Sequence, residues 1–301
     1  MKSYCFAAID IGSNAIRLLV SNVFDDGTNI TIKKQSLVRV PVRLGADAFL
    51  HKIIPKLKED EFLSAMHAFH HLLKVYRPLK IRAIATSAFR EADNGIEIVN
   101  RVYTETGIRI EIVTGKEEAE VIYANGLRDN MDTDSSYLYM DVGGGSTELT
   151  LFNNHEVIVS RSFNVGSIRL LMNSIPDEYW LEMKEWVREI GQQSTQNLSL
   201  IGSGGNINKY CKLLMKDYGE ALNYDEIYHL YKRLKHMSSD ERIQKLYLNP
   251  DRADVIVPAG KIFTSVMRWS GCEVAYVPKI GVSDGLIKML YEQFKLERAF
   301  A

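Results

Sequence analysis

The residues with the clearest potential for chemistry lie in one stretch, residues 140–150, which read MDVGGGSTELT. Apolar, β-favouring residues lead into it and follow it, so a strand, a glycine turn and a second strand are predicted. The turn, Gly143 to Ser146, can bring backbone N–H groups close to a phosphate because its glycines carry no Cβ. Asp141 and Glu148 would repel each other unless a divalent cation lies between them. The stretch predicts a phosphate site beside a metal site, with a plain hairpin as the alternative.

A shorter stretch near the N-terminus has the same design. An apolar run ends at Asp10, the turn residues Gly12, Ser13 and Asn14 follow, and a second apolar run begins at Ala15. Each stretch also opens an antiparallel meander of strands. Two halves that begin alike indicate an internal repeat. The chain is therefore expected to fold as duplicated α/β domains whose two phosphate turns face each other across a cleft.

Two further segments of the first half follow predicted strands, where loops commonly carry function. The loop at residues 86–91 holds two hydroxyls and a guanidinium directly after a strand end. A capping box that ends at Glu117 begins the next helix. Glu118 is not needed by that cap, so its carboxylate either projects into a cleft or compensates the helix dipole. Residue types alone leave both roles open.

The second half contains a third glycine-rich turn, which holds Gly204 and Gly205 between a predicted strand and a predicted helix. A glycine-rich loop between a strand and a helix N-terminus can again bind an anion or a nucleotide, although the motif alone is a weak signal. Elsewhere the pattern predicts amphipathic helices, including one within residues 250–268. The expected N-caps of three of the helices are Asn94, Ser239 and Ser283.

The composition indicates a two-domain globular protein. The chain has 301 residues and 46% hydrophobic content, which is enough to fill two cores. No apolar run is long enough to span a bilayer and no signal peptide is recognised, so a cytoplasmic location is expected. His67 and His71 have the spacing of a metal pair but lack further ligands, and they are interpreted as structural. Neither a disulfide nor a structural zinc is expected from the three cysteines, Cys5, Cys211 and Cys272.

The charge balance limits the possible ligands. The formal net charge is -1, from 37 basic and 38 acidic residues. Such a balance gives no global attraction for nucleic acid, so neither nucleic acid nor a membrane is expected as a partner. A polyanionic ligand would have to be held by a local cluster of Arg and Lys in a cleft.

Seven motifs taken together resemble the exopolyphosphatase and guanosine-pentaphosphate phosphohydrolase (Ppx/GppA) family in order and spacing. They are AIDIGSNAIRLLV, ATSAFREADN, IVTGKEEAEVIYANG, MDVGGGSTEL, NVGSIRL, IGSGGN and NPDRADVIVPAG. The resemblance implies an α/β fold of duplicated ribonuclease-H-like domains, as in the actin, sugar kinase and Hsp70 ATPase superfamily, with the active site in the interdomain cleft. The implied domains are residues 1–128 and 129–301, and the last helix is free to pack back on the first domain.

The resemblance also implies an activity, the hydrolytic removal of a terminal phosphate from inorganic polyphosphate or from the 5′ end of pppGpp, with Mg²⁺ or Mn²⁺ as cofactor. Glu118 matches the general base of the family. The expected metal ligands are Asp10, Asp141 and Glu148. The residues expected to bind substrate phosphate are Ser13, Asn14, Arg17, Ser87, Arg90, Gly143, Gly144, Gly145, Ser146, Arg169, Gly204 and Gly205.

The chain departs from the family pattern at three points. Ala15 stands in place of a Ser or Thr, Asn206 stands in place of a Thr, and the segment around Ser283 lacks a basic residue. These changes concern the grip on substrate and not the chemistry. Because the chain also has no Lys/Arg-rich run, a distributive enzyme that prefers short polyphosphates or pppGpp is expected, and so is a homodimer. The alternatives are a small-molecule kinase of the same superfamily and a nucleotide-gated binding module.

Overall fold

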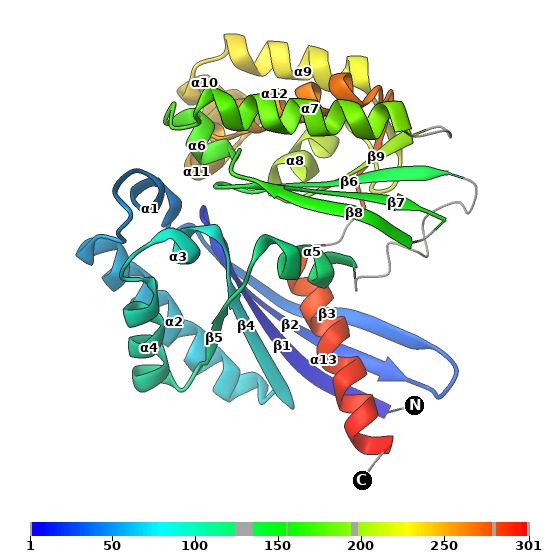
Figure 1. Ribbon diagram of the computed structural model, residues 1–301. Coiled ribbons are helices and arrows are strands. Elements are labelled where there is room, and N and C mark those ends of the chain that lie inside the picture. Colours follow the sequence, from blue (N-terminus) through cyan, green and yellow to red (C-terminus); the bar gives the residue numbers. More distant parts are fainter. Residues whose placement is uncertain (1, 124–134, 155, 194–197, 279–280, 300–301) are drawn as a thin grey trace. The chain divides into compact units, whose positions relative to one another are not determined.

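The chain divides into two compact units, Met1–Asn125 together with Gly281–Ala301, and Gly126–Ile280. The computed structural model describes residues 2–123, 135–154, 156–193, 198–278 and 281–299. Each unit is built on its own β-sheet, with helices packed against it (Figure 1). The boundary expected after residue 128 lies outside the described residues.

The sheet of the first unit has the strand order β3-β2-β1-β4-β5. Strands β1, β2 and β3 form an antiparallel meander, as the two turn signals near residues 12 and 27 predict, while β4 and β5 continue the sheet parallel to β1. The strands are β1 (Lys2–Ile11), β2 (Ile16–Asp25), β3 (Ile30–Val40), β4 (Lys80–Ala85) and β5 (Ile110–Ile112).

Helices lie on both sides of this sheet. The helices are α1 (Gly45–His51), α2 (Lys56–Tyr76), α3 (Ser87–Glu91), α4 (Gly95–Thr106), α5 (Gly115–Tyr123) and α13 (Val282–Ala299). Helix α13 crosses one face and contacts β1, β2, β4 and α5, whereas α2 and α4 pack together on the other side (Figure 1). The last helix, which was expected inside the range 129–301 but free to pack back, thus belongs to the first unit.

Aromatic and polar contacts attach α13 to the first sheet. The ring of Phe6 lies 6.1 Å from that of Tyr291 and 5.7 Å from that of Phe294. The Tyr291 hydroxyl donates to Asp25 Oδ2 over 2.5 Å, and this hydrogen bond lowers the pKa of Asp25. Burial, together with the same bond, raises the pKa of Tyr291 to about 12. The helix is therefore an integral layer of this unit.

The sheet of the second unit has the order β10-β11-β9-β6-β7-β8. Its meander β6-β7-β8 corresponds to β1-β2-β3, and the parallel strands β9 and β11 correspond to β4 and β5, with β10 added at one edge. The predicted internal repeat is thus present as two sheets of matching order. The strands are β6 (Ser136–Val142), β7 (Thr147–Asn153), β8 (Glu156–Phe163), β9 (Leu198–Ser203), β10 (Ala221–Asn223) and β11 (Val274–Tyr276).

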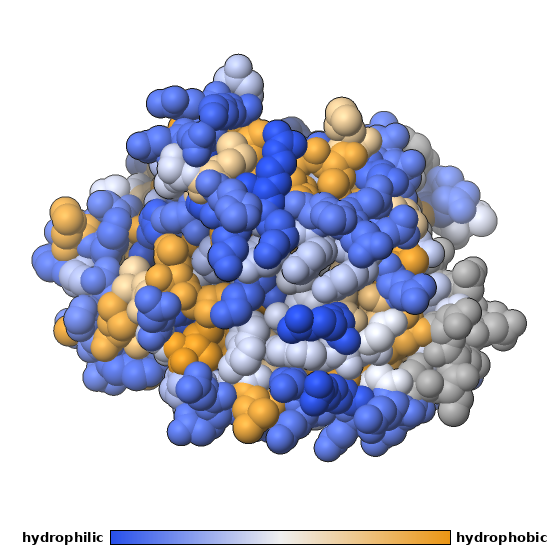
Figure 2. All heavy atoms as spheres, turned by 90° about the horizontal axis from the view of Figure 1, so that it is seen from above, coloured by the Kyte–Doolittle hydropathy of each residue, from blue (hydrophilic) through white to orange (hydrophobic). Residues whose placement is uncertain are grey.

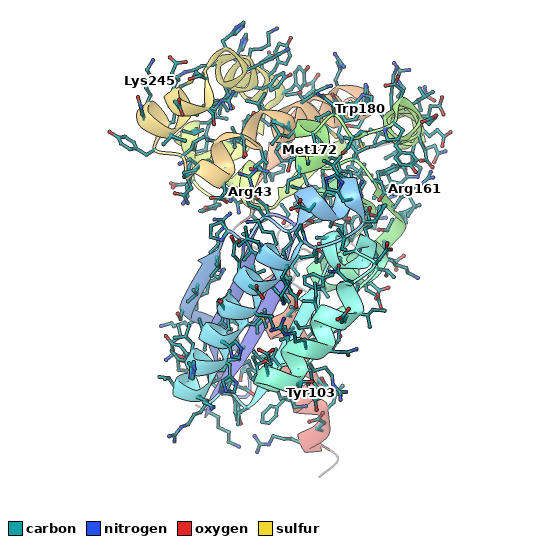
Figure 3. All side chains as sticks on the ribbon, turned by 90° about the vertical axis from the view of Figure 1, so that its left-hand side faces the viewer. Arg43, Tyr103, Arg161, Met172, Trp180 and Lys245 are labelled. Carbon is teal, nitrogen blue, oxygen red and sulfur yellow. The ribbon has the colours of Figure 1, made fainter. Side chains whose placement is uncertain are left out.

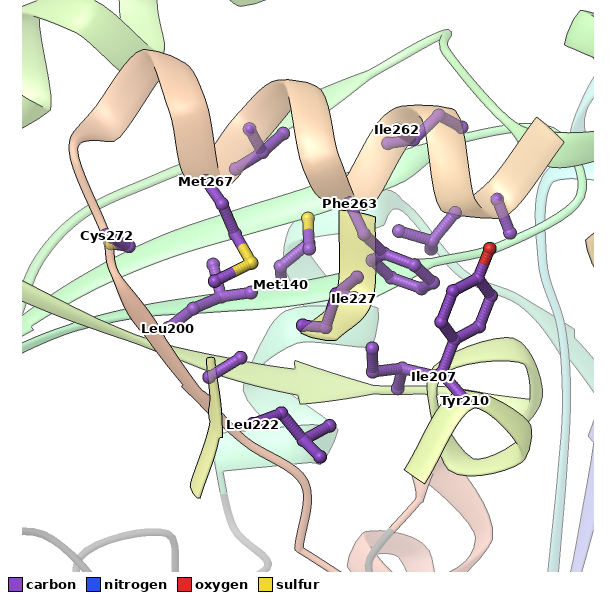
Figure 4. Packing of buried hydrophobic residues seen from close by; sticks show 14 of the residues in the cluster. Met140, Leu200, Ile207, Tyr210, Leu222, Ile227, Ile262, Phe263, Met267 and Cys272 are labelled. Carbon is purple, nitrogen blue, oxygen red and sulfur yellow. The ribbon is translucent and has the colours of Figure 1, made fainter. Parts of the chain in front are cut away.

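The core of the second unit lies between one face of its sheet and the central helix α12. Met140 and Leu200 from the sheet meet Phe263 and Met267 from α12, with Tyr210 of α8 beside them (Figure 4). The helices are α6 (Ser167–Leu171), α7 (Asp177–Gln193), α8 (Gly205–Leu213), α9 (Tyr224–His236), α10 (Ser239–Leu246), α11 (Pro250–Ala253) and α12 (Ile256–Ser270).

One face of the molecule is mainly polar. The face shown in Figure 2 is predominantly hydrophilic, with apolar side chains in separate small areas. On β8, Arg161, which is labelled in Figure 3, pairs with Glu182 of α7. Its guanidinium also lies 5.1 Å from the centre of the Phe163 ring. No helix in the described part of the chain is both long and apolar enough to cross a membrane.

The structure corrects several predicted helix starts. Asn94 occupies the predicted N-cap position of α4, but its carboxamide bonds the backbone N–H and C=O of Ile54, each over 2.9 Å, and makes no capping hydrogen bond. The cap of α10 is Ser238, one residue before the predicted Ser239. Ser283 lies inside α13, which begins at Val282. The helix predicted within residues 250–268 is interrupted and forms α11 and α12.

Candidate active site

The first of the two predicted phosphate turns joins β1 to β2. The Gly12 N–H donates to the Ala15 carbonyl over 3.2 Å and closes a four-residue turn. Ser13 and Ser87 are both buried, and their hydroxyl oxygens lie 2.8 Å apart. Because Ser87 opens α3 directly after β4, the turn and this strand end form one polar edge. Two predicted phosphate contacts, Ser13 and Ser87, are thus neighbours.

The second turn joins β6 to β7 with the same geometry. The Gly143 N–H donates to the Ser146 carbonyl over 2.9 Å. Val142 pairs with Thr147 directly below the turn, as Ile11 pairs with Ile16 in the first unit. The two turns are therefore equivalent parts of the repeat.

A glycine-containing segment after the third strand of each meander holds the turn from one side. In the first unit, the Gly45 N–H donates to the Ser13 carbonyl over 2.8 Å. In the second unit, the Ser167 N–H donates to the Gly143 carbonyl over 3.0 Å. A Cβ on Gly166 would lie 2.3 Å from the Gly144 carbonyl oxygen, so only glycine permits this approach. Sequence reasoning did not assign this role to Gly45 or Gly166.

We expect Gly166→Ala to impair both folding and activity. Its new methyl group would overlap the backbone of Gly144 and Gly145, and overpacking of this kind costs about 1–3 kcal/mol. Urea unfolding measures the loss of stability, and phosphate release measures the displacement of the turn. Gly219→Ala is the comparison, since its surroundings are open and only its backbone is strained. Unchanged activity in Gly166→Ala would show that the turn does not depend on this contact.

The two units differ in the charge that faces the first aspartate of each turn. Asp10 pairs in register with Arg17, and Arg17 Nη1 lies 2.7 Å from Asp10 Oδ2. Asp141 pairs in register with Glu148. Residues directly opposite on antiparallel strands lie on the same face, where like charges destabilise the pair. Asp10 therefore faces a guanidinium across its strand pair, whereas Asp141 faces a second carboxylate.

The donor set of the second unit fits a hard divalent cation. Glu148 is only 2% exposed, and its Oε1 accepts a hydrogen bond from the Ser162 hydroxyl over 2.9 Å. Mg²⁺ is commonly held by one or two carboxylates, with water and substrate phosphates completing its shell. Two carboxylates on one sheet face meet that need, although no group of three His, Cys, Asp or Glu suited to a metal occurs among the described residues.

Two of the predicted phosphate-binding arginines contact the protein backbone. Arg169 is 7% exposed, and its Nε donates to the Gly145 carbonyl over 2.8 Å. Arg90 Nη1 donates to the Val113 carbonyl over 2.6 Å. Arg169 therefore supports the second turn through the Gly145 carbonyl. The Arg90 side chain is thus held by Val113, a residue that follows β5 and lies just before the start of α5.

Glu118 lies in the first turn of α5. Its N–H donates to the Thr114 carbonyl over 3.0 Å. The predicted capping box is present, because the Glu117 carboxylate accepts from the Thr114 N–H over 2.7 Å and from its hydroxyl over 2.8 Å. These bonds lower the pKa of Glu117. The two adjacent glutamates thus have separate surroundings, and Glu117 is the one bound by the cap.

The third glycine turn leads from β9 into α8. Gly204 has φ +97°, and a Cβ there would lie 2.7 Å from Asp141 Oδ1. A Cβ on Gly205 would lie 2.6 Å from the Arg252 guanidinium, whose Nη1 donates to Asn206 Oδ1 over 3.3 Å. Asn206, which stands in place of the Thr of the family pattern, therefore contacts an arginine.

Burial, with the nearby charges of Lys212 and Arg252, lowers the pKa of Lys209 in α8.

The predicted residues fall into two groups. The first unit holds Asp10, Ser13, Asn14, Arg17, Ser87, Arg90 and Glu118. The second unit holds Asp141, Gly143, Gly144, Gly145, Ser146, Glu148, Arg169, Gly204 and Gly205. The histidines interpreted as structural lie on α2, where His67 Nε2 contacts Glu105 Oε2 over 2.8 Å.

Comparison with solved structures confirms the predicted fold. The chain is similar to an exopolyphosphatase of Cytophaga hutchinsonii, with a TM-score of 0.83 and 22% identity over 96% of this chain and 98% of that one. It is similar to a Ppx/GppA family member of Aquifex aeolicus, with a TM-score of 0.77 and 22% identity over 97% and 99% of the two chains. The α/β architecture with two mixed sheets is thus shared with these proteins.

Comparison with known sequences addresses the family. The chain is 28% identical to a bifunctional 3-dehydroquinate synthase/phosphatase of Fusobacterium nucleatum over 97% of its own length and 47% of the relative. It is 29% identical to exopolyphosphatase 1 of Mycobacterium leprae over 56% of its length and 49% of the relative. The chain thus spans about half the length of these relatives. The model of the Ppx/GppA phosphatase family matches residues 28–293, and the chain belongs to that family, as its motifs predicted.

Proposed function

We propose that this protein is a metal-dependent phosphoanhydride hydrolase that releases the terminal phosphate of inorganic polyphosphate or of pppGpp. The observation that carries the proposal is the Asp141–Glu148 pair, which is the second residue pair below the glycine turn of a phosphatase-family chain. Two facing carboxylates call for a cation, and the turn beside them offers backbone N–H groups to an anion. The Mycobacterium leprae relative, named an exopolyphosphatase, supports this substrate class.

Phosphate binding is assigned to the two equivalent turns, one in each unit, and to their neighbours. The turn Gly143 to Ser146 and the turn around Ser13 and Asn14 would donate hydrogen bonds to phosphate oxygens. Arg90 and Arg17 would supply positive charge, although each also has a contact within the protein. Arg169 would act indirectly, because its Nε already holds the Gly145 carbonyl.

Asp141 and Glu148 would hold the divalent cation. Asp10 is less suited to direct ligation, because the Arg17 guanidinium already compensates its charge, and we assign it a contact through water. When bound, the cation would neutralise charge on the phosphate oxygens. The Ser162 hydroxyl donates to Glu148 Oε1 and so helps to orient the carboxylate that would hold the cation.

Hydrolysis requires an oriented water as well as a held phosphate. We assign this task to Glu118, whose carboxylate would accept a proton from water as the water oxygen bonds to the terminal phosphorus. The anhydride P–O bond then breaks, and the shortened chain leaves with the bond's electron pair. The first turn of a helix is a fixed backbone position, so the carboxylate would be preorganised for this step.

A kinase of the same fold would transfer the phosphate to an acceptor instead of to water. The decisive experiment incubates the protein with tripolyphosphate and Mg²⁺, without any acceptor, and measures free phosphate. Release of phosphate at catalytic rates supports the hydrolase. Phosphate transfer that occurs only with ATP and a sugar or small acid would replace the proposal with a kinase. Parallel incubation with pppGpp, read as conversion to ppGpp, tests the nucleotide as substrate.

We expect the enzyme to act distributively on long polyphosphate. A processive enzyme needs an extended cationic track, whereas this chain has 37 basic against 38 acidic residues and no run rich in Lys and Arg. Partial digestion of a polyphosphate of several hundred units should shorten the whole population gradually. Full-length chains beside free phosphate, without intermediates, would contradict this expectation. The expected homodimer and cytoplasmic location stay predictions, and light scattering would measure the former.

A further inference from the structure

A row of four polar side chains crosses the second sheet beside the glycine turns. Asp141 pairs in register with Ser203 on β9 and with Glu148 on β7, and Glu148 pairs with Ser162 on β8. Paired residues on neighbouring strands lie on the same face of a sheet. The order across the sheet is therefore Ser203, Asp141, Glu148, Ser162, with one hydroxyl at each end of the carboxylate pair.

Neighbouring residues confirm which face the row occupies. Gly202 faces α8, because a Cβ there would lie 2.9 Å from Ile207 Cγ1. Successive residues of a strand alternate between faces, so Ser203 points to the opposite side. On β6, Met140 belongs to the core cluster that includes Ile207, and Asp141 likewise points away from it. Ser203 and Asp141 thus share the face that does not carry this core.

The two terminal hydroxyls differ in their bonding. The Ser162 hydroxyl donates to Glu148 Oε1 over 2.9 Å. The Ser203 hydroxyl is buried, with the residue only 1% exposed, and finds no hydrogen-bond partner in the part of the chain that the structure describes. Asp141 Oδ1 reaches the adjacent Gly204, close enough that a Cβ would lie 2.7 Å away. A buried hydroxyl of this kind destabilises the fold unless a ligand satisfies it.

We propose that Ser203 is a further ligand-binding residue of the second unit, and that its hydroxyl bonds an oxygen held at the Asp141 carboxylate through a divalent cation. This oxygen belongs either to a cation-bound water or to a substrate phosphate. The inference rests on the proposed function, since it uses the cation site of Asp141 and Glu148. It adds a residue of the IGSGGN motif to which no role was assigned from the sequence, and the signal for it is the register between β6 and β9.

The test uses Ser203→Ala, with Ser203→Thr to restore a hydroxyl. Binding of Mn²⁺ alone is measured by electron paramagnetic resonance, and binding of tripolyphosphate in Ca²⁺ is measured by calorimetry. One lost hydrogen bond should weaken binding roughly tenfold in one of these measurements. A weaker Mn²⁺ affinity identifies the oxygen as that of water, whereas an effect on tripolyphosphate only identifies a phosphate oxygen. Ser203→Thr should recover most of the loss.

Thermal unfolding without ligand separates this role from a structural one. Removal of an unsatisfied hydroxyl should leave the melting temperature of Ser203→Ala equal to or above that of the wild type. The matched control is Ser21→Ala, which removes a buried hydroxyl of β2 that also lacks a partner among the described residues. Ser21→Ala should leave both binding measurements unchanged.

The possible failures are distinguishable. Equal binding by wild type and Ser203→Ala in both measurements would overturn the inference and leave the proposed function intact. A lower melting temperature of Ser203→Ala without ligand would assign the hydroxyl a structural role and also overturn it. The proposed cation site fails if the wild-type protein binds no Mn²⁺, or if Asp141→Asn does not abolish the binding. In either case the inference fails with it.

Discussion

Glu118→Gln is expected to fold and to bind substrate but to lose about 10²- to 10⁴-fold in turnover, the usual contribution of a positioned general base. An amide has nearly the shape of the carboxylate but cannot accept a proton from water. The α5 backbone that places it would be unaffected, because the Glu118 N–H bond to the Thr114 carbonyl does not involve the side chain. Steady-state phosphate release at saturating substrate gives kcat, and calorimetry with tripolyphosphate in Ca²⁺ reports binding.

Glu117→Gln is a closely matched control for this variant. It makes the same chemical change one residue earlier, at the carboxylate that caps α5 through the Thr114 N–H and hydroxyl. Because these bonds lower the pKa of Glu117, their stabilising effect is present above the pKa of the unfolded chain and is lost as pH falls through the folded value. Glu117→Gln should therefore reduce stability at neutral pH more than in acid, with turnover nearly unchanged. Equal turnover losses in both variants would remove Glu118 from the mechanism.

Much of the fold follows from local patterns in the sequence. The Asp-x-Gly turns near residues 10 and 141 predicted two matching halves, and the two sheets have matching strand orders. The capping box at Thr114 and Glu117 was also predicted and is present. These features are local, because a turn or a cap is determined by residues within four positions of each other.

Features that depend on distant contacts were not predictable in the same way. Asn94 fits an N-cap by type, but a backbone segment 40 positions away in sequence engages its carboxamide instead. The position of α13 was left open, because an amphipathic pattern shows that a helix has an apolar face but not which sheet covers it. Arg169 was expected to contact phosphate, and its bond to the Gly145 carbonyl follows only from the packing of the segment after β8 on the turn.

The charge difference between the two halves was available in the sequence. Arg17 lies seven positions after Asp10, and Glu148 lies at the same separation after Asp141. In a hairpin with a four-residue turn, this spacing places the two side chains directly opposite each other. Treating Asp10 and Asp141 as equivalent metal ligands ignored the residue that each one faces. The pairing favours the cation site in the second half.

Asp141→Asn is expected to abolish most activity and to weaken cation binding. An amide is a poorer ligand for a hard cation than a carboxylate, and the stabilisation of charge that a bound cation provides amounts to several kcal/mol. A loss of about 10²- to 10³-fold in kcat/KM is therefore expected. Phosphate release as a function of Mg²⁺ concentration should show both a lower maximum and a higher half-saturating concentration. Wild-type activity that survives exhaustive chelation would contradict the cation site altogether.

The stability of Asp141→Asn should change in opposite directions with and without the cation. Without it, the substitution removes the repulsion between Asp141 and Glu148, which face each other in register, so the melting temperature should rise. With Mg²⁺ at 100 times its Kd, a bound cation stabilises the wild type by about 2.7 kcal/mol, and the variant should lose most of that gain. Asp10→Asn is the matched comparison, because it breaks the 2.7 Å ion pair with Arg17. It should lower the melting temperature, and it should reduce the increase that Mg²⁺ produces far less than Asp141→Asn does, because Asp10 is assigned only a contact through water. If the two variants lost the Mg²⁺ effect equally, the cation would depend on both halves and not on the Asp141–Glu148 pair alone.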